Sequence, residues 1–208
     1  MADFRGKIGM LPEVTKPHTI RPLGPVECER LAAMVSRISA ATWAGEDALK
    51  ENDFPVFHHT RHIVFRFIES NRDPAKWYAN PAWDVWAPML LPVMEQAIAE
   101  YGFAEPQFPK AMLARLAAGH RIDPHYDGAG SNLRTHKIHV PLFTNPDALF
   151  LVRDEKVHLE RGYAYEVNNI VSHGVENGGS EDRIHFIFEV YDAAATLPGE
   201  EQAEHAAL

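Results

Sequence analysis

The sequence predicts a single, mainly β domain, an antiparallel sandwich or barrel with flanking helices. From Phe108 onward, short apolar runs alternate with turn residues, which is typical of antiparallel sheets and not of parallel βαβ units. Helical spacing of apolar residues is found before that point. The chain has 208 residues, of which 46% are hydrophobic and 24% charged, so it can bury one sizeable core.

The composition argues against several classes of partner. The formal net charge is −9, whereas proteins that bind nucleic-acid backbones carry basic patches. No apolar run approaches the roughly 20 residues that span a bilayer, and residues 1–7 lack the apolar core of a signal peptide. Cys28 is the only cysteine, so an internal disulfide is excluded. We therefore expect a cytoplasmic protein, monomeric or homodimeric, that binds neither nucleic acid nor membrane.

The first part of the chain, residues 1–107, is expected to supply supporting structure. Pro25 suits the first turn of a helix, where its missing N–H costs nothing. A β-branched and aromatic run ending at Ile68 indicates a strand. The expected elements are an irregular arm (1–17), a short strand (19–23), a helix from Pro25 to about Ile38, a loop that can include a helical turn (42–55), a strand (60–67), and a lid or packing collar (71–83).

Residues 83–102 carry the strongest helical pattern in the chain. Pro88 and Pro92 are expected to kink or interrupt its first half. Gly102 follows the last apolar position, where glycine suits a C-terminal cap. The apolar side chains recur at intervals of three and four residues, at Trp86, Leu90, Val93, Met94, Ala97, Ile98 and Tyr101.

Residues 108–192 are expected to form the core of the β structure and to carry the functional site. Residues 193–208 are rich in alanine and glutamate and predict a frayed tail. The strands that we expect in the core segment are 109–117, 121–127, 135–142, 148–152, 156–159, 163–167 and 183–191.

Two histidines and one aspartate in this segment suit a metal site. His125 and Asp127 are two residues apart on an extended segment, so their side chains should point to the same side. His173 can supply a third ligand from a distant strand. Two histidines and a carboxylate on one face form the triad of non-haem Fe(II) oxygenases, which leaves open positions for a co-substrate and O₂.

The neighbouring residues support this interpretation. Pro124 restrains the segment before the ligands, and Gly128 and Gly130 permit a turn after them. His173 precedes a glycine-rich hairpin, and Arg183 opens the returning strand. We expect these two strands to pair, which would bring Arg183 close to His173. An arginine beside a metal site suits a dicarboxylate, because its planar fork binds one carboxylate while the other chelates the metal.

Residues 119–192 resemble the aspartyl/asparaginyl β-hydroxylase family of Fe(II)- and 2-oxoglutarate-dependent dioxygenases. The resemblance covers the C-terminal half well and the N-terminal half only loosely. It rests on His125-Tyr126-Asp127, the strand with His139-Val140-Pro141-Leu142, the turn after Arg161-Gly162, and His173 followed by Arg183-Ile184-His185.

The resemblance implies a double-stranded β-helix, a cupin-like jelly roll with helices packed outside it. It implies that iron is bound by His125, Asp127 and His173. Arg183 would hold the distal carboxylate of 2-oxoglutarate, and His139 would make a second contact. The implied reaction hydroxylates an unactivated C–H of an amino acid or amino-acid residue, with Fe(II), 2-oxoglutarate and O₂ required and succinate and CO₂ released.

Several points stay open at this level. The strand over residues 134–139 offers Arg134, His136 and Lys137 besides His139, so the side chain that faces the co-substrate is not fixed. For Arg183 the competing interpretation is an ion pair with a neighbouring acid, Glu181 or Asp182. For His136 and His185 we expect histidines that are satisfied within a strand, and for Asn132 and Asn168 we expect turn formers.

The alternative function is a cupin-like metal-binding sensor or a metal-dependent isomerase without 2-oxoglutarate turnover. Arg183 argues against it, because such a protein needs no clamp for a dicarboxylate. The substrate is expected to be small and amino-acid-like, with a peptide as the alternative. Arg61, His62 and Arg134 are the candidates for binding a carboxylate of the substrate.

Overall fold

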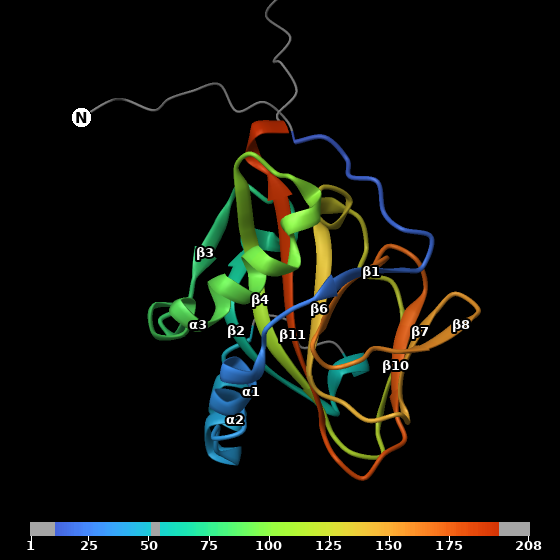
Figure 1. The fold of residues 1–208 in the computed structure, drawn as a ribbon. Coiled ribbons are helices and arrows are strands. Elements are labelled where there is room, and N and C mark those ends of the chain that lie inside the picture. Colours follow the sequence, from blue (N-terminus) through green and yellow to red (C-terminus); the bar gives the residue numbers. More distant parts are fainter. Residues whose placement is uncertain (1–10, 51–54, 196–208) are drawn as a thin grey trace, which may run out of the picture.

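The computed structural model describes residues 11–50 and 55–195 of the chain. Within them, two antiparallel sheets face each other and form a jelly roll, with three helices on one outer side (Figure 1). The larger sheet has the strand order β1-β9-β6-β11-β4-β2-β3, and the smaller sheet has the order β5-β10-β7-β8. The double-stranded β-helix that the resemblance implied is confirmed.

The strands of the two sheets come from both halves of the sequence. The larger sheet contains β1 (Ile20–Pro25), β2 (Thr60–Ile68), β3 (Trp77–Ala79), β4 (Pro106–Leu116), β6 (His136–Phe143), β9 (Tyr163–Val167) and β11 (Arg183–Asp192). The smaller sheet contains β5 (Arg121–His125), β7 (Ala148–Val152), β8 (Glu155–His158) and β10 (His173–Asn177). Single-turn 3₁₀ helices occur at Pro55–Phe57, Glu69–Asn71, Ala99–Tyr101, Gly130–Leu133 and Ala193–Ala195.

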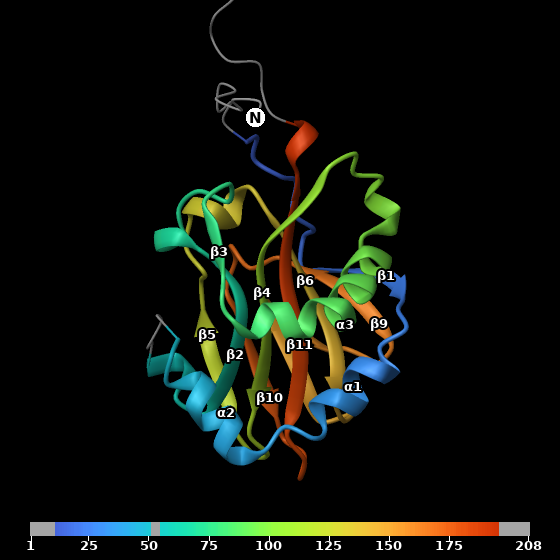
Figure 2. The same ribbon diagram turned by 90° about the vertical axis from the view of Figure 1, so that its left-hand side faces the viewer.

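The helices α1 (Glu29–Val35), α2 (Ala40–Asp47) and α3 (Ala82–Ala97) cover the outer face of the larger sheet (Figure 2). Their buried side chains meet the outward-facing side chains of the sheet in one apolar cluster. This cluster includes Leu31, Val35, Trp43, Leu90 and Met94 from the helices, and Ile63, Phe65, Leu113, Ile138, Val140, Phe186 and Phe188 from the strands. No helix in the described part of the chain is both long and apolar enough to cross a membrane.

Strand β11 shows how the sequence separates the core from the site. Side chains alternate between the two faces of a strand, so Ile184, Phe186 and Phe188 enter the apolar cluster under the helices. The intervening residues, among them Arg183 and Glu189, face the space between the sheets. Both faces of this strand are therefore buried, one apolar and the other polar.

The space between the sheets contains a second apolar cluster, whose side chains come from both sheets. It is built from Leu116, Phe150, Val152, Leu159, Tyr165, Val167 and Val175. The rest of this space is an open cavity of about 750 Å³. That volume lies within the range of small-molecule sites.

Several predicted elements are confirmed with small changes in their bounds. The strands over 148–152 and 163–167 occur as expected, and β1, β2, β4, β6 and β8 differ by a few residues. Gly102 has φ of 63° and ends the helical segment as a left-handed cap. The expected helix near Pro25 begins later, at Glu29.

Three segments of the first half differ from the sequence interpretation. Residues 42–55 are not a loop throughout, because α2 extends to Asp47; Ser39 caps it by accepting a hydrogen bond from the Thr42 backbone N–H. The segment 71–83 contains the short edge strand β3. Helix α3 continues through Pro88 and Pro92, since both prolines face solvent, where water can bond the carbonyls that they leave free. Residues 1–10 of the expected arm and 196–208 of the expected tail lie outside the described residues.

The expected pairing of the strands after His173 was also wrong. β10 pairs with β5 and β7, whereas β11 pairs with β4 and β6 in the other sheet. The short connection between β10 and β11 therefore crosses from one sheet to the other instead of forming a hairpin. Arg183 still reaches the same cavity as His173, because the two sheets face each other across it.

Candidate metal centre and co-substrate pocket

Two strands and one loop bring the predicted metal ligands together. His125 ends β5 and lies directly opposite His173, the first residue of β10. Asp127 lies two residues beyond the end of β5, and its backbone N–H donates to the Asn169 carbonyl. One potential ligand atom from each of the three side chains lies within 4.8 Å of the others. Because β5 ends at His125, this loop contact, rather than strand alternation alone, places Asp127 beside the histidines.

Both histidines present the same nitrogen to the aspartate. The Nδ1 atoms of His125 and His173 lie 2.9 Å from the backbone carbonyl oxygens of Asp123 and Val171. A carbonyl oxygen only accepts, so each Nδ1 carries the proton and each Nε2 has a free lone pair. Each Nε2 lies 3.6 Å from the same atom, Oδ1 of Asp127. Three electron-pair donors thus converge on one point, which is the donor set that a divalent cation needs.

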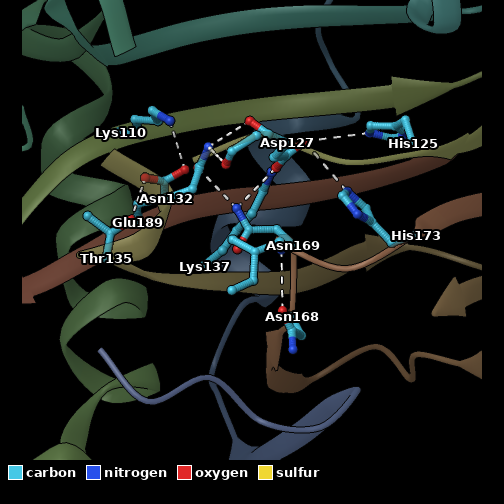
Figure 3. Close-up of polar contacts among 12 residues, drawn as sticks. Lys110, His125, Asp127, Asn132, Thr135, Lys137, Asn168, Asn169, His173 and Glu189 are labelled. Carbon is cyan, nitrogen blue, oxygen red and sulfur yellow. Dashed lines mark hydrogen bonds and ion pairs between the residues drawn. The ribbon is translucent and has the colours of Figure 1, made fainter. Parts of the chain in front are cut away.

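The second carboxylate oxygen of Asp127, Oδ2, is contacted by Lys137 and Asn169 (Figure 3). The Lys137 ammonium forms an ion pair with Oδ2, and Asn169 Nδ2 donates to the same oxygen at 3.1 Å. Asn132 Nδ2 donates to the Asp127 backbone carbonyl at 2.9 Å. Burial opposes ionisation, but the Lys137 ammonium holds the pKa of Asp127 well below its usual range. The carboxylate is therefore ionised, and its orientation leaves Oδ1 directed at the histidines.

Asn169 is itself anchored by residues far away in the sequence. Lys16 Nζ donates to Asn169 Oδ1 at 2.9 Å and to the Thr135 carbonyl. Asn169 Nδ2 also donates to Asn132 Oδ1 at 3.0 Å. The sequence interpretation missed Asn169 and Lys16, and it considered Lys137 only as an open candidate. No local pattern marks Asn169 and Lys16, because these side-chain contacts span 37 residues or more.

Arg183 lies at another part of the cavity, buried and without an acidic partner. Its side chain forms no ion pair with any described residue, and Asp182 instead accepts a hydrogen bond from Arg115 Nε at 2.6 Å. Arg183 Nη2 donates to Nδ1 of His185 at 2.7 Å. Burial lowers the pKa of Arg183 to about 9, so the side chain remains charged at neutral pH. A buried cation of this kind calls for an anion from outside the chain.

His139 lines the cavity near Arg183 and is buried. Burial, followed by the nearby Lys137 and Arg183 charges, holds the pKa of His139 well below its usual range. Burial and Arg183 do the same for His185. Both rings are therefore neutral, and His139 can offer a hydrogen bond to a polar ligand in the cavity. The competing interpretation of Arg183, an ion pair with its acidic neighbours, is not what the structure shows.

The three substrate candidates from the sequence are separated by the fold. His62 lines the cavity together with Val64. Arg61 is exposed and shares the outer face of β2 with Ile63, since side chains alternate along a strand. Arg134 closes the 3₁₀ turn before β6 and does not line the cavity. The expectation for Arg61 and Arg134 is therefore withdrawn.

The predictions for His136, Asn132 and Asn168 agree with the structure. The prediction for His185 was wrong, because its buried Nε2 has no hydrogen-bond partner among the described residues. His136 is satisfied within its strand, with Nδ1 2.6 Å from Glu166 Oε1. Asn132 and Asn168 bind backbone carbonyls of neighbouring turns and arms, and are not placed among the candidate ligands. Gly130 has φ of 81°, and a Cβ on it would meet the Asn71 carbonyl at 3.0 Å, so glycine is required there.

Residues 79–193, more than half of the chain, match the family model of the aspartyl/asparaginyl beta-hydroxylases. The protein belongs to the aspartyl/asparaginyl β-hydroxylase family. No curated protein sequence matches the chain. As a member of this family it is a 2-oxoglutarate-dependent non-haem iron dioxygenase of the hydroxylase type, with Fe(II), 2-oxoglutarate and O₂ as its cofactor and co-substrates.

Solved structures share the fold of this β-hydroxylase family member. One is a 2OG-Fe(II) oxygenase family oxidoreductase from Burkholderia pseudomallei, with 12% identity, a TM-score of 0.51, and coverage of 80% of this chain and 90% of the other. Another is the viral collagen prolyl hydroxylase of Paramecium Bursaria Chlorella virus-1 in complex with 2OG. It has 10% identity and a TM-score of 0.53, and the match covers 83% of this chain and 95% of the other. At these identities the similarity shows the fold.

Proposed function

We propose that this dioxygenase hydroxylates an unactivated C–H bond of an amino acid or amino-acid residue, with iron held by His125, Asp127 and His173. Arg183 binds the distal carboxylate of 2-oxoglutarate, and His139 makes a second contact. The observation that carries the proposal is the convergence of three free ligand atoms in the same cavity as a buried arginine that has no carboxylate partner among the described residues.

The two histidines fit the metal because their tautomers are already set. Each Nδ1–H donates to the backbone carbonyl two residues earlier, which fixes the ring and leaves Nε2 free to bind. Lys137 and Asn169 occupy Oδ2 of Asp127, so that Oδ1 is the oxygen available for coordination. A carboxylate that binds through one oxygen would leave coordination positions open for 2-oxoglutarate and O₂. When bound, iron and 2-oxoglutarate supply the oxidising chemistry, and the co-substrate is converted to succinate and CO₂.

Arg183 fits the co-substrate through both its charge and its surroundings. Its contact with His185 orients the guanidinium, and the apolar side chains of Phe150 and Val167 line the cavity beside it. A carboxylate there would form charge-assisted hydrogen bonds in a region that excludes water. The apolar wall also keeps solvent away from the reacting centre.

The first experiment is anaerobic and spectroscopic. Fe(II) is added, followed by 2-oxoglutarate, and the visible charge-transfer band of an iron–2-oxoglutarate chelate is recorded. We expect a band in the native protein, no band in His173→Ala, and weaker 2-oxoglutarate binding in Arg183→Met. His120→Ala and Arg161→Met are the matched controls, because neither side chain lines the cavity.

The outcomes separate the competing functions. If iron binds but no band forms, the 2-oxoglutarate site is wrong and the cupin-like sensor or isomerase becomes the better interpretation. If the protein binds no metal, the ligand set is wrong. Unchanged 2-oxoglutarate binding in Arg183→Met would remove Arg183 alone from the proposal.

A further inference from the structure

The cavity has two charged ends, and the proposed cofactor contacts account for one of them. Arg183 and Glu189 both face the cavity from β11 and are six residues apart, which is about 20 Å along a strand. Arg183 is assigned to 2-oxoglutarate. The Glu189 end also carries charged groups, and neither the proposed metal ligands nor the co-substrate contacts use Lys110 or Glu189.

This second end is a row of charges across three neighbouring strands. Strand register places Glu189 directly opposite Lys110 of β4 on one side and Lys137 of β6 on the other. Lys110 Nζ lies 2.9 Å from Glu189 Oε1, and Thr135 Oγ1 donates to Oε2 at 2.8 Å (Figure 3). Lys137 in turn pairs with Asp127, so the row ends at the proposed metal site. Lys110, Lys137 and Glu189 all line the cavity.

Burial makes this arrangement costly unless it has a use. Lys110 is 6% exposed and Glu189 is 2% exposed. Replacing a buried ion pair with apolar side chains is often neutral or stabilising, so such a pair is weak evidence for a structural role. Buried charges that face a cavity next to a reactive centre are instead candidates for a functional site. Burial opposes the ionised form of Glu189, but Lys110 and Lys137 hold its pKa below the usual value.

Lys110 and Glu189 have donor and acceptor positions that the hydrogen bonds among the described residues do not use. An ammonium has three N–H donors, and Lys110 uses one of them, on Glu189, among the described hydrogen bonds. A carboxylate has about four acceptor positions, of which Glu189 uses one for Lys110 and one for Thr135. The unused donors of Lys110 can bind a carboxylate, and the unused acceptors of Glu189 can bind an ammonium. Because the two side chains are adjacent, they suit a molecule that carries both groups close together.

The wall beside this row is apolar. Phe67 lies with its ring centre 5.3 Å from Lys110 Nζ, and Met112, Val64 and Ile187 also line the cavity. A ligand held by its charged groups at Lys110 and Glu189 would therefore place an uncharged side chain against these residues. That side chain would lie next to Asp127, which Lys137 connects to the row.

We infer that Lys110 and Glu189 form the head-group subsite for a free α-amino acid with an apolar side chain. This inference rests on the proposed function and deepens it. Lys110 binds the α-carboxylate and Glu189 binds the α-ammonium of the substrate. A residue within a peptide has neither charge, so its backbone would leave these buried groups without charged partners.

The test measures binding without turnover. Enzyme loaded with Mn(II) and 2-oxoglutarate is titrated anaerobically by calorimetry with apolar L-amino acids from alanine to phenylalanine. For the tightest binder, its amide, its N-acetyl derivative and its doubly blocked N-acetyl amide are then titrated. We expect each blocked form to bind at least about tenfold more weakly, because each lacks one of the two charges. Equal or tighter binding of the doubly blocked form would overturn the inference in favour of a peptide substrate.

Substitutions test the two residues directly. In Glu189→Gln and Lys110→Met we expect affinity for the amino acid to fall at least about tenfold. Since Lys110→Met leaves a buried carboxylate unpaired, the double variant Lys110→Met/Glu189→Met, which removes both charges, is measured beside it. Lys156→Met is the matched control, because Lys156 is exposed and outside the cavity. Unchanged affinity in the variants, or no binding of any amino acid to the native enzyme, would overturn the inference.

The charge-transfer band separates this inference from the proposed function. With Fe(II) and 2-oxoglutarate alone, the double variant should give the same band as the native protein, which also shows that it folds. If the band is present in all variants and amino acids fail to bind, the head-group subsite is wrong while the dioxygenase site stands. If the native protein gives no band, the proposed function itself fails.

Discussion

A single methyl group at Gly174 should disturb the metal site from the backbone side. Gly174 follows His173 on β10, next to an irregularity in the pairing with β5. A Cβ at this position would lie 2.7 Å from the carbonyl oxygen of Ile122, on the strand that carries His125. Ordinary van der Waals contact begins near 3.4 Å. In Gly174→Ala, β5 and β10 must therefore separate locally by about 0.7 Å, the difference between 3.4 and 2.7 Å.

This displacement is large for a metal site and moderate for the fold. Functional groups need to be held within about 0.5 Å of the productive geometry. We expect the affinity for Co(II), used as an air-stable probe, to fall at least about tenfold, as it does when the support of a ligand is lost. Overpacking a well-filled region costs about 1–3 kcal/mol, so the free energy of unfolding should fall by that amount.

Gly45 supplies the matched control for the same substitution. It is a solvent-exposed residue within α2, and a Cβ there would meet nothing within 4 Å. Gly45→Ala should raise the free energy of unfolding by about 0.5–1 kcal/mol, because alanine loses less backbone entropy in a helix. Metal affinity should not change. Urea denaturation and Co(II) titration of both variants measure the two effects.

The decisive result is a lower free energy of unfolding in Gly174→Ala and a higher one in Gly45→Ala. If Gly174→Ala unfolds at the native urea concentration and binds Co(II) with native affinity, the close approach of β5 and β10 is not a constraint on the site. Lower stability with unchanged metal affinity would show that the strand adjusts away from His125, and would refute the link between this contact and the metal ligands.

Three further predictions concern the co-substrate site, pH and the core. Arg183→Met should weaken 2-oxoglutarate binding by about tenfold to a hundredfold in calorimetry, since a charge-assisted hydrogen bond contributes about 1.5–3 kcal/mol; a native dissociation constant would exclude Arg183 from the site. Because burial lowers the pKa values of His139 and His185, the unfolded chain binds more protons below its histidine pKa of about 6.5. Unfolding free energy should therefore fall as the pH drops from 7 to 5, by at most about 1.4 kcal/mol per pH unit for each histidine, and His185→Gln should flatten the fall; a flat native profile would contradict this. Phe186→Ala, in the core under the helices, should lower the free energy of unfolding by about 3–5 kcal/mol in urea denaturation. A loss below about 1 kcal/mol would mean that the core around Phe186 is not tightly packed.

Part of the candidate site could be predicted from the sequence, because the alternation of side chains along a strand depends only on local geometry. Alternation along the chain from Arg183 to Val190 shows which residues share a face of the strand, because the period of two is a property of the extended backbone. The same alternation in β2 separates His62 from Arg61, so it contained the information that corrects the assignment of Arg61. The triad of His125, Asp127 and His173 was accessible because its residue types and context are distinctive.

The sequence did not show in the same way which strands pair with each other, or in which sheet each strand lies. The sequence interpretation paired the strand of His173 with the strand of Arg183, but the structure places them in different sheets. A glycine-rich connection is compatible with both arrangements, since it fixes neither the direction nor the sheet of the next strand. The choice depends on which apolar surfaces bury each other, and that is a property of the whole chain.

What the sequence by itself determined is the mainly β class, the alternation of the strand faces, the three candidate metal ligands and the arginine expected near them. Only the tertiary structure decided that Lys137 and Asn169 hold the outer oxygen of Asp127, and that Lys110 and Glu189 form a second charged end of the cavity. The physical reason is distance along the chain. Lys110 and Glu189 are 79 residues apart and meet because β4 and β11 pair in one particular register, which no local pattern specifies.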